Sequence, residues 1–102
     1  MEFRLSVDRL LNQIGYWEQA RWSVPASAGS GATKADSVYA VIQRLADLAA
    51  DAEHRPHRTV PRLSDLILPD QLRVMADDVL TTADSATLAA ATADLDSLRH
   101  TL

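Results

Sequence analysis

Hydrophobic residues recur at intervals of three and four in several parts of this chain, which is the spacing of one helical face. The longest uninterrupted pattern runs from Asp36 to Glu53, and Pro56 follows it closely. Asp36 is a suitable N-cap because its carboxylate can accept from the free amides of a first turn. Proline cannot continue a helix interior. We therefore predict a helix over 36–53 that organises the others, with an apolar face of Val38, Val41, Ile42, Leu45, Leu48, Ala49 and Ala52.

An earlier pattern predicts a first helix that is capped by Ser6 and ends near Arg21. Gly15 lies inside this helix and weakens it by about 1 kcal/mol relative to alanine. The apolar face consists of Val7, Leu10, Leu11, Ile14 and Trp17.

The last third of the chain predicts two more helices. Pro69 suits the first turn of one of them, and Asp84 or Ser85 caps the other. The short connection between these helices makes them antiparallel neighbours. Their faces are Leu72, Met75, Ala76, Val79, Leu80 and Ala83 in the first, and Leu88, Ala91, Leu95, Leu98 and Leu102 in the second.

Two segments lack helical periodicity. Residues 23–35 are rich in glycine, serine and alanine and predict a flexible linker. Residues 54–62 contain two prolines and predict an irregular connection. No strand pair is evident, so we predict a single all-α domain over 1–102, with four amphipathic helices in an antiparallel bundle.

The composition restricts the function. The chain has no cysteine, which excludes disulfides, thiolate metal sites and cysteine nucleophiles. Its net charge is −4, whereas a protein that binds nucleic acid over its whole surface is basic. No apolar stretch approaches the ~20 residues of a membrane span, and no signal peptide is recognisable. We expect a cytoplasmic protein, and the predominance of arginine over the single Lys34 suggests a bacterial origin.

One candidate metal site lies at the end of the long helix. Asp47, Asp51 and His54 share a stripe, and His57 follows closely enough to complete a set of oxygen and nitrogen ligands. The alternative is a solvated polar face, which we favour because the stripe lies off the apolar face. No nucleophile–base pair is visible, so we expect neither catalysis nor a cofactor.

The only basic cluster contains Arg55, Arg58 and Arg62, beside two histidines. Guanidinium groups can hold a phosphate, an acidic peptide or a nucleic-acid backbone. Surface pairing with nearby carboxylates is the simpler interpretation, and we favour it.

Most aromatic residues are gathered near the end of the first helix. Trp17 falls on the apolar face, and Tyr16 and Trp22 fall at its margins. Marginal aromatics are typical interface anchors, although packing at the core edge is the simpler interpretation. Tyr39 also falls outside the apolar stripes, as do Ile67 and Val74. We interpret these positions as a surface that packs against a neighbouring element or a second subunit.

We therefore expect a protein–protein interaction module whose partner is another protein or a second copy, as a homodimer. Two alternatives remain open. One is a metal-binding protein or metal-dependent hydrolase that uses the Asp47 to His57 set. The other is a regulator that contacts nucleic acid through residues 54–62.

Overall fold

The structure is a computed structural model that describes residues 2–102. These residues form five α-helices and one 3₁₀ turn, η1, with no strand among them. The bounds are Glu2–Ile14 for α1, Gln19–Trp22 for α2, Lys34–Ala52 for α3, Asp65–Ile67 for η1, Leu68–Thr82 for α4 and Ser85–Thr101 for α5. The predicted all-α bundle is confirmed.

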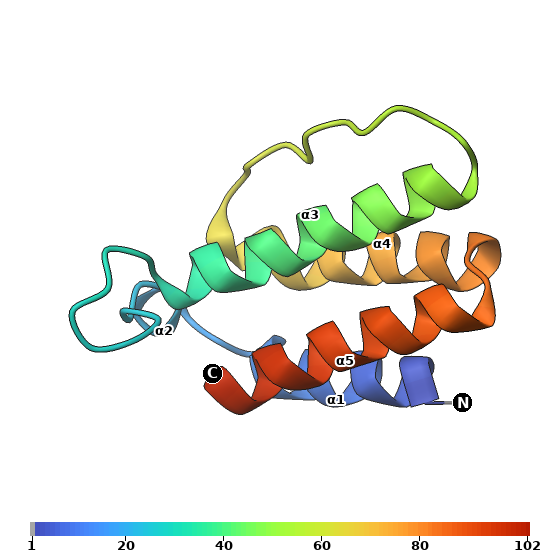
Figure 1. The fold of residues 1–102 in the computed structure, drawn as a ribbon. Coiled ribbons are helices and arrows are strands. Elements are labelled where there is room, and N and C mark those ends of the chain that lie inside the picture. Colours follow the sequence, from blue (N-terminus) through green and yellow to red (C-terminus); the bar gives the residue numbers. More distant parts are fainter. Residues whose placement is uncertain (1) are drawn as a thin grey trace.

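The four long helices form a ring in which α3 packs on α4, α4 on α1, α1 on α5, and α5 on α3. Figure 1 shows that α3 and α4 run in the same direction, as do α1 and α5. The bundle is therefore not antiparallel throughout. The α4–α5 pair is antiparallel as expected, but these helices lie across the diagonal of the ring and have little contact.

Polar contacts fix these directions. Ser6 Oγ donates to Asp96 Oδ1 at 2.8 Å, which joins the middle of α1 to the later half of α5. Arg44 pairs with Asp94, and Lys34 Nζ donates to the carbonyl of Leu102. The first contact joins the middles of α3 and α5, and the second joins the start of α3 to the end of α5, as an antiparallel pair requires.

The first helix begins earlier than the sequence pattern predicts. Phe3 is buried with Val7 and Leu10, so it belongs to the same helical face. Ser6 is consequently an interior residue of α1 and not its N-cap. It is also buried, which explains why its hydroxyl is hydrogen bonded to another helix.

The chain turns sharply after Ile14 instead of continuing to Arg21. Gly15 N–H still donates to Leu11 O at 2.8 Å, but the helix ends there. A Cβ at Gly15 would lie 2.7 Å from Leu11 O, closer than real Cβ atoms approach. The turn redirects the chain into α2, and this brings Trp22 into the core, where it is 0% exposed.

Helix α3 is capped by Thr33, not by Asp36. Thr33 Oγ1 accepts from the Asp36 N–H at 3.2 Å, and Asp36 Oδ2 accepts from the Thr33 N–H at 2.9 Å. This reciprocal capping box satisfies two amides at the helix start. Lys34 and Ala35, placed in the linker by the sequence pattern, therefore belong to α3.

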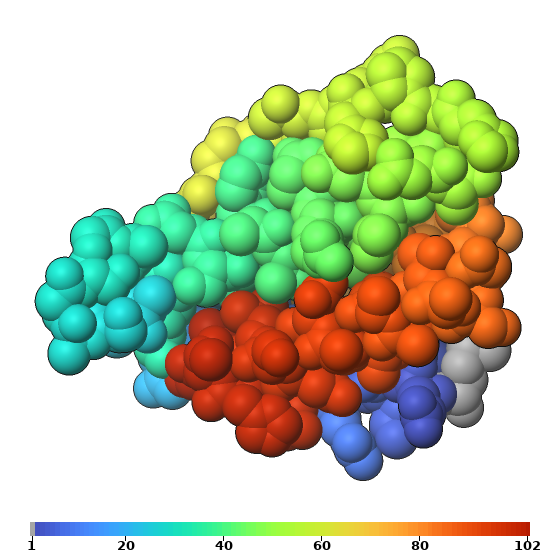
Figure 2. All heavy atoms as spheres, viewed as in Figure 1, coloured from blue at the N-terminus to red at the C-terminus, as the bar shows by residue number. Residues whose placement is uncertain are grey.

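The rest of the glycine- and serine-rich segment folds back on itself. Ala26 N–H donates to Ala32 O at 2.9 Å, and Lys34 N–H donates to Val24 O at 2.8 Å. Gly29 supplies the positive φ of 75° that this reversal requires. The loop projects from one end of the bundle (Figures 1 and 2). Its flexibility stays a prediction.

Candidate functional site

Most of the candidate residues lie on or beneath one segment, residues 53–64, which we call the strap. Because α3 and α4 are parallel, the strap must return along the length of α3 before α4 can begin (Figure 1). It starts at the C-cap Glu53, followed by His54 with a positive φ of 55°. Arg55 N–H donates back to Ala50 O at 2.8 Å. The space-filling view shows the strap lying along α3 (Figure 2).

Two side chains of α3 hold the middle of the strap. Gln43 donates to Arg58 O at 3.0 Å and accepts from Val60 N–H at 2.7 Å. Tyr39 donates its hydroxyl to Val60 O. Val60 is buried in the core, so both of its backbone groups need protein partners. The hydroxyl of Tyr39 therefore anchors this connection to α3.

The strap brings three of the four candidate metal ligands together. His57 Nε2 lies 2.6 Å from Asp51 Oδ1, and His57 Nδ1 lies 3.6 Å from Asp47 Oδ1. His54 lies at the turn into the strap and takes no part in these contacts. Within residues 2–102, no three acidic or histidine side chains are arranged to hold a metal ion. The contacts instead form a histidine latch between the strap and α3.

This latch is stronger when the His57 ring is protonated. The hydrogen bond to Asp51 raises the pKa of His57 above its ordinary value of 6.5, and the charges of Asp47 and Asp51 act in the same direction. A histidine whose pKa is raised by folding stabilises the folded state most below its unfolded pKa. The latch is therefore strongest in mildly acidic solution, and it weakens as the pH rises through the folded pKa of His57.

We expect Asp51→Asn to lower the pKa of His57 toward 6.5, because the main cause of the raised pKa is removed. Asp47→Asn should lower it less, since Asp47 acts only through its charge at the longer distance. An NMR titration of the His57 ring protons measures both effects. An equal shift in the two variants would contradict the geometry of the latch.

The three candidate anion-binding arginines have different surroundings. Arg55 pairs with Glu53 at 2.7 Å. Arg62 pairs with Asp36 at 3.0 Å and with Asp65 at 3.4 Å. Arg58 forms no ion pair with any group in the described part of the chain. Of the three, Arg58 alone has a guanidinium that is not paired with a carboxylate in the described part of the chain.

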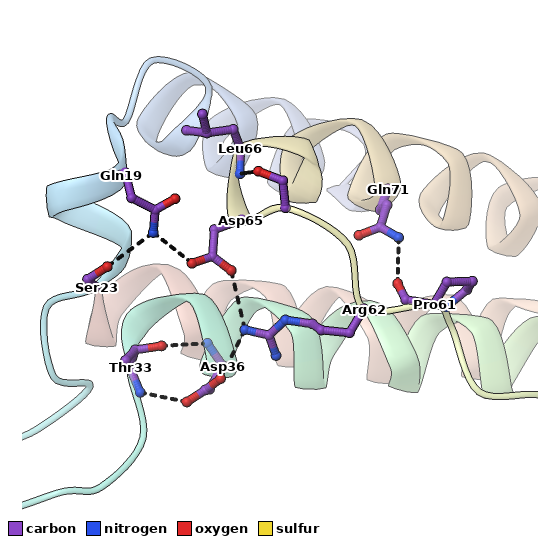
Figure 3. A network of polar contacts seen from close by, with 10 residues as sticks. Gln19, Ser23, Thr33, Asp36, Pro61, Arg62, Asp65, Leu66 and Gln71 are labelled. Carbon is purple, nitrogen blue, oxygen red and sulfur yellow. Dashed lines mark hydrogen bonds and ion pairs between the residues drawn. The ribbon is translucent and has the colours of Figure 1, made fainter.

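Arg62 lies at the centre of a network that fixes the C-terminal end of the strap, next to η1 (Figure 3). Its guanidinium lies 4.8 Å from the Tyr39 ring centroid while it pairs with Asp36 and Asp65. The Thr33 backbone N–H and, after it, Arg62 lower the pKa of the Asp36 carboxyl below 3.8. The α3 cap, the strap and η1 therefore share one charged cluster.

Two glutamines extend this network to neighbouring helices. Gln19 of α2 donates to Asp65 Oδ2 at 2.9 Å, and Gln71 of α4 donates to Pro61 O at 3.0 Å (Figure 3). Ser64 caps η1 by accepting from Leu66 N–H at 3.3 Å. The η1 turn is thus held by side chains of α2 and the strap, and Gln71 of α4 holds the strap just before this turn.

The aromatic cluster is arranged differently from the sequence prediction. Trp22, placed at the margin by the helical pattern, is fully buried, so its side chain is not available to a partner. Trp17 is half-buried, with its ring edge-to-face against Trp22 at 4.9 Å and Arg21 5.0 Å from its centroid. Tyr16 is 90% exposed. The break at Gly15 causes this reversal because it rotates the residues that follow.

A further apolar surface lies where the strap leads through η1 into α4. Four large aliphatic side chains at the end of the strap, on η1 and on α4 are between 39% and 56% exposed, and we call them the η1–α4 surface: Leu63, Leu66, Ile67 and Val74. Two of them, Ile67 and Val74, lie seven residues apart and therefore share one face. Their position outside the predicted apolar stripe was the sequence signal for this surface.

Every helix within residues 2–102 is too short or too polar to cross a bilayer. No family model matches the sequence, and no significant match appears among curated proteins or solved structures.

Proposed function

We propose that this protein is a protein–protein interaction module that associates with a second copy of itself through the η1–α4 surface. One observation carries the proposal. Large aliphatic side chains remain exposed on a turn that the surrounding polar network holds in place. Leu66 and Val74 are 54% and 56% exposed, respectively. Burying each of them in an interface is worth about 1 kcal/mol or more.

The rigidity of the turn supports a role in binding. A surface that is already ordered loses little conformational entropy on association, so more of the contact energy appears as affinity. The pairs of Arg62 with Asp36 and Asp65, and the bond from Gln19, fix η1 before any partner arrives. Aliphatic groups scattered on a mobile loop would not have this advantage.

The charges of α4 favour a second copy as the partner. In a two-fold arrangement with antiparallel α4 helices, Ile67 faces the copy's Val74, and the relation is reciprocal. Arg73 then lies within about 3 Å, measured along the helix axis, of the copy's Asp70. Both residues are exposed and free of ion pairs among residues 2–102. The apolar contact and its charged rim are therefore self-complementary.

The solution mass tests this proposal. Sedimentation velocity between about 1 and 200 µM should show the 11.1 kDa chain converting to a species of twice that mass. The double variant Leu66→Asp, Val74→Asp should stay monomeric, because two charges would be buried without partners. Leu5→Asp is the matched control, since Leu5 is 48% exposed on α1, outside the η1–α4 surface.

A monomer throughout this range would refute the proposal, as would a dimer that the Leu5 variant disrupts as much as the double variant.

The other functions expected from the sequence have less support. Two of the three guanidiniums of the basic segment are paired with carboxylates, which weakens a role in contacting nucleic acid. The cytoplasmic location and bacterial origin stay predictions.

A further inference from the structure

A hollow of about 280 Å³ lies between α3, α4 and the strap. Its apolar lining includes Ala46 and Ala50 of α3, Met75 of α4, and Val60 of the strap. Two small residues one helical turn apart leave room on α3 that larger side chains would fill. The volume lies just below the ~300–1,000 Å³ range of small-molecule sites. The hollow therefore suits a compact ligand.

The outer wall of this hollow is held in place by named contacts. Gln43 holds the strap at Arg58 O and Val60 N–H, and Gln71 holds it at Pro61 O. His57 is latched to Asp51 on the same segment. Two prolines, Pro56 and Pro61, line the wall and restrict its backbone. The strap is thus prevented from collapsing onto the alanines.

Two residues of opposite charge line the hollow. Arg58 and Asp78 both line the hollow. They form no ion pair with each other or with any other group in the described chain. Arg55 also lines the hollow, but Glu53 neutralises it at 2.7 Å. The lining therefore offers one free guanidinium and one free carboxylate together with apolar side chains.

From this arrangement we propose that the hollow binds a free α-amino acid with an apolar side chain. Arg58 holds the ligand's carboxylate through a charge-assisted hydrogen bond, and Asp78 accepts from its ammonium group. The side chain of the ligand covers Ala46, Ala50 and Met75. A simple monocarboxylate suits the site less well because it would be repelled by Asp78 and leave this group without a partner.

The test compares zwitterions with ligands that carry only one of the two charges. The zwitterionic probes are L-leucine, L-valine, L-methionine and L-phenylalanine. Two analogues of leucine carry a single charge: isocaproate lacks the amine, and isoamylamine lacks the carboxylate. Binding is measured on the whole protein by amide chemical shifts in NMR. We expect at least one amino acid to bind with a Kd of about 1 mM or tighter and to shift the amides of Thr59 and Val60. Isocaproate and isoamylamine should bind at least about tenfold more weakly than leucine.

Substitutions test which residue binds the carboxylate of the ligand and which binds its ammonium group. Arg58→Ala should weaken the amino acid and isocaproate alike by about tenfold. Asp78→Ala should weaken only the amino acid and isoamylamine. Asp77→Ala is the matched control, because Asp77 is the adjacent residue on α4 and lines a different groove. Ala46→Leu should abolish binding by filling the hollow, with amide spectra reporting whether the fold is retained.

Three results would overturn the proposal. The first is the absence of binding by all four amino acids at about 20 mM. The second is isocaproate binding as tightly as leucine, which would make the hollow a monocarboxylate site. The third is an equal loss in the Asp77 and Asp78 variants, which would place the ligand elsewhere.

Discussion

Replacing Trp22 with alanine is expected to lower the free energy of unfolding by about 3–5 kcal/mol. The side chain is 0% exposed and packs edge-to-face on Trp17, so its removal leaves a large cavity at the end of the bundle. Proteins of this size have total stabilities of ~5–15 kcal/mol, so the loss is a large part of the whole. Urea denaturation followed by far-UV circular dichroism measures the effect without relying on tryptophan fluorescence.

The matched control is Tyr16→Ala. Tyr16 is an aromatic residue in the turn between α1 and α2, and it is 90% exposed. Its removal should change stability by no more than about 0.5 kcal/mol. If the two variants lost equal stability, the assignment of Trp22 to the core and of Tyr16 to the surface would be wrong.

Gln43→Leu is expected to lower the free energy of unfolding by about 1–3 kcal/mol, because the buried Val60 N–H loses its acceptor. Arg58 O loses its donor at the same time. The strap should open locally before the bundle unfolds, since α3 and α4 retain their apolar contacts. Hydrogen exchange at the Val60 amide measures this opening directly.

Gln13→Leu makes the same chemical change on α1, away from the strap, and serves as the control. It should leave exchange at Val60 unchanged. Unaltered protection of Val60 in the Gln43 variant would show that Gln43 does not hold the strap.

The long helices could be predicted from the sequence because their buried positions are periodic. Ile42, Leu45 and Ala49 were assigned to the inner face of α3, and all three are buried. Asp84, one of the two expected caps of α5, accepts from Thr87 N–H at 2.8 Å. Pro69 lies in the first turn of α4, where its fixed φ suits the helix. Local chemistry and helical periodicity are sufficient at these positions.

The first and last residues of α1 could not be predicted from periodicity. Phe3, Leu5 and Val7 also alternate, and this obscured the helical relation between Phe3 and Val7. Gly15 was recognised as a weak point, but a glycine alone does not state whether a helix bends, continues or stops. Trp22 was misplaced as a consequence, because a helical pattern carried through the break assigns it the wrong face.

The sequence predicted an irregular connection over 54–62, but not the contacts that hold it against α3, because these are tertiary polar contacts and follow no repeating pattern. Gln43 and Tyr39 lie off the apolar stripe of α3, so periodicity marks them as surface residues. Their partners are mainly backbone atoms of Arg58 and Val60, which a side-chain pattern does not reveal. The one signal was Val60, an isolated aliphatic residue close to Pro61 in an otherwise polar connection.

The parallel packing of α1 on α5 has a consequence for the order in which the molecule assembles. Helix α1 leaves the ribosome well before α5, so the face of α1 that includes Phe3 and Val7 stays partly uncovered until α5 has emerged. The α3–strap–α4 unit, in contrast, closes over a shorter stretch of chain and needs neither terminal helix for its internal contacts. Folding should therefore begin with this central unit and finish with the joining of the two terminal helices, a step of high contact order.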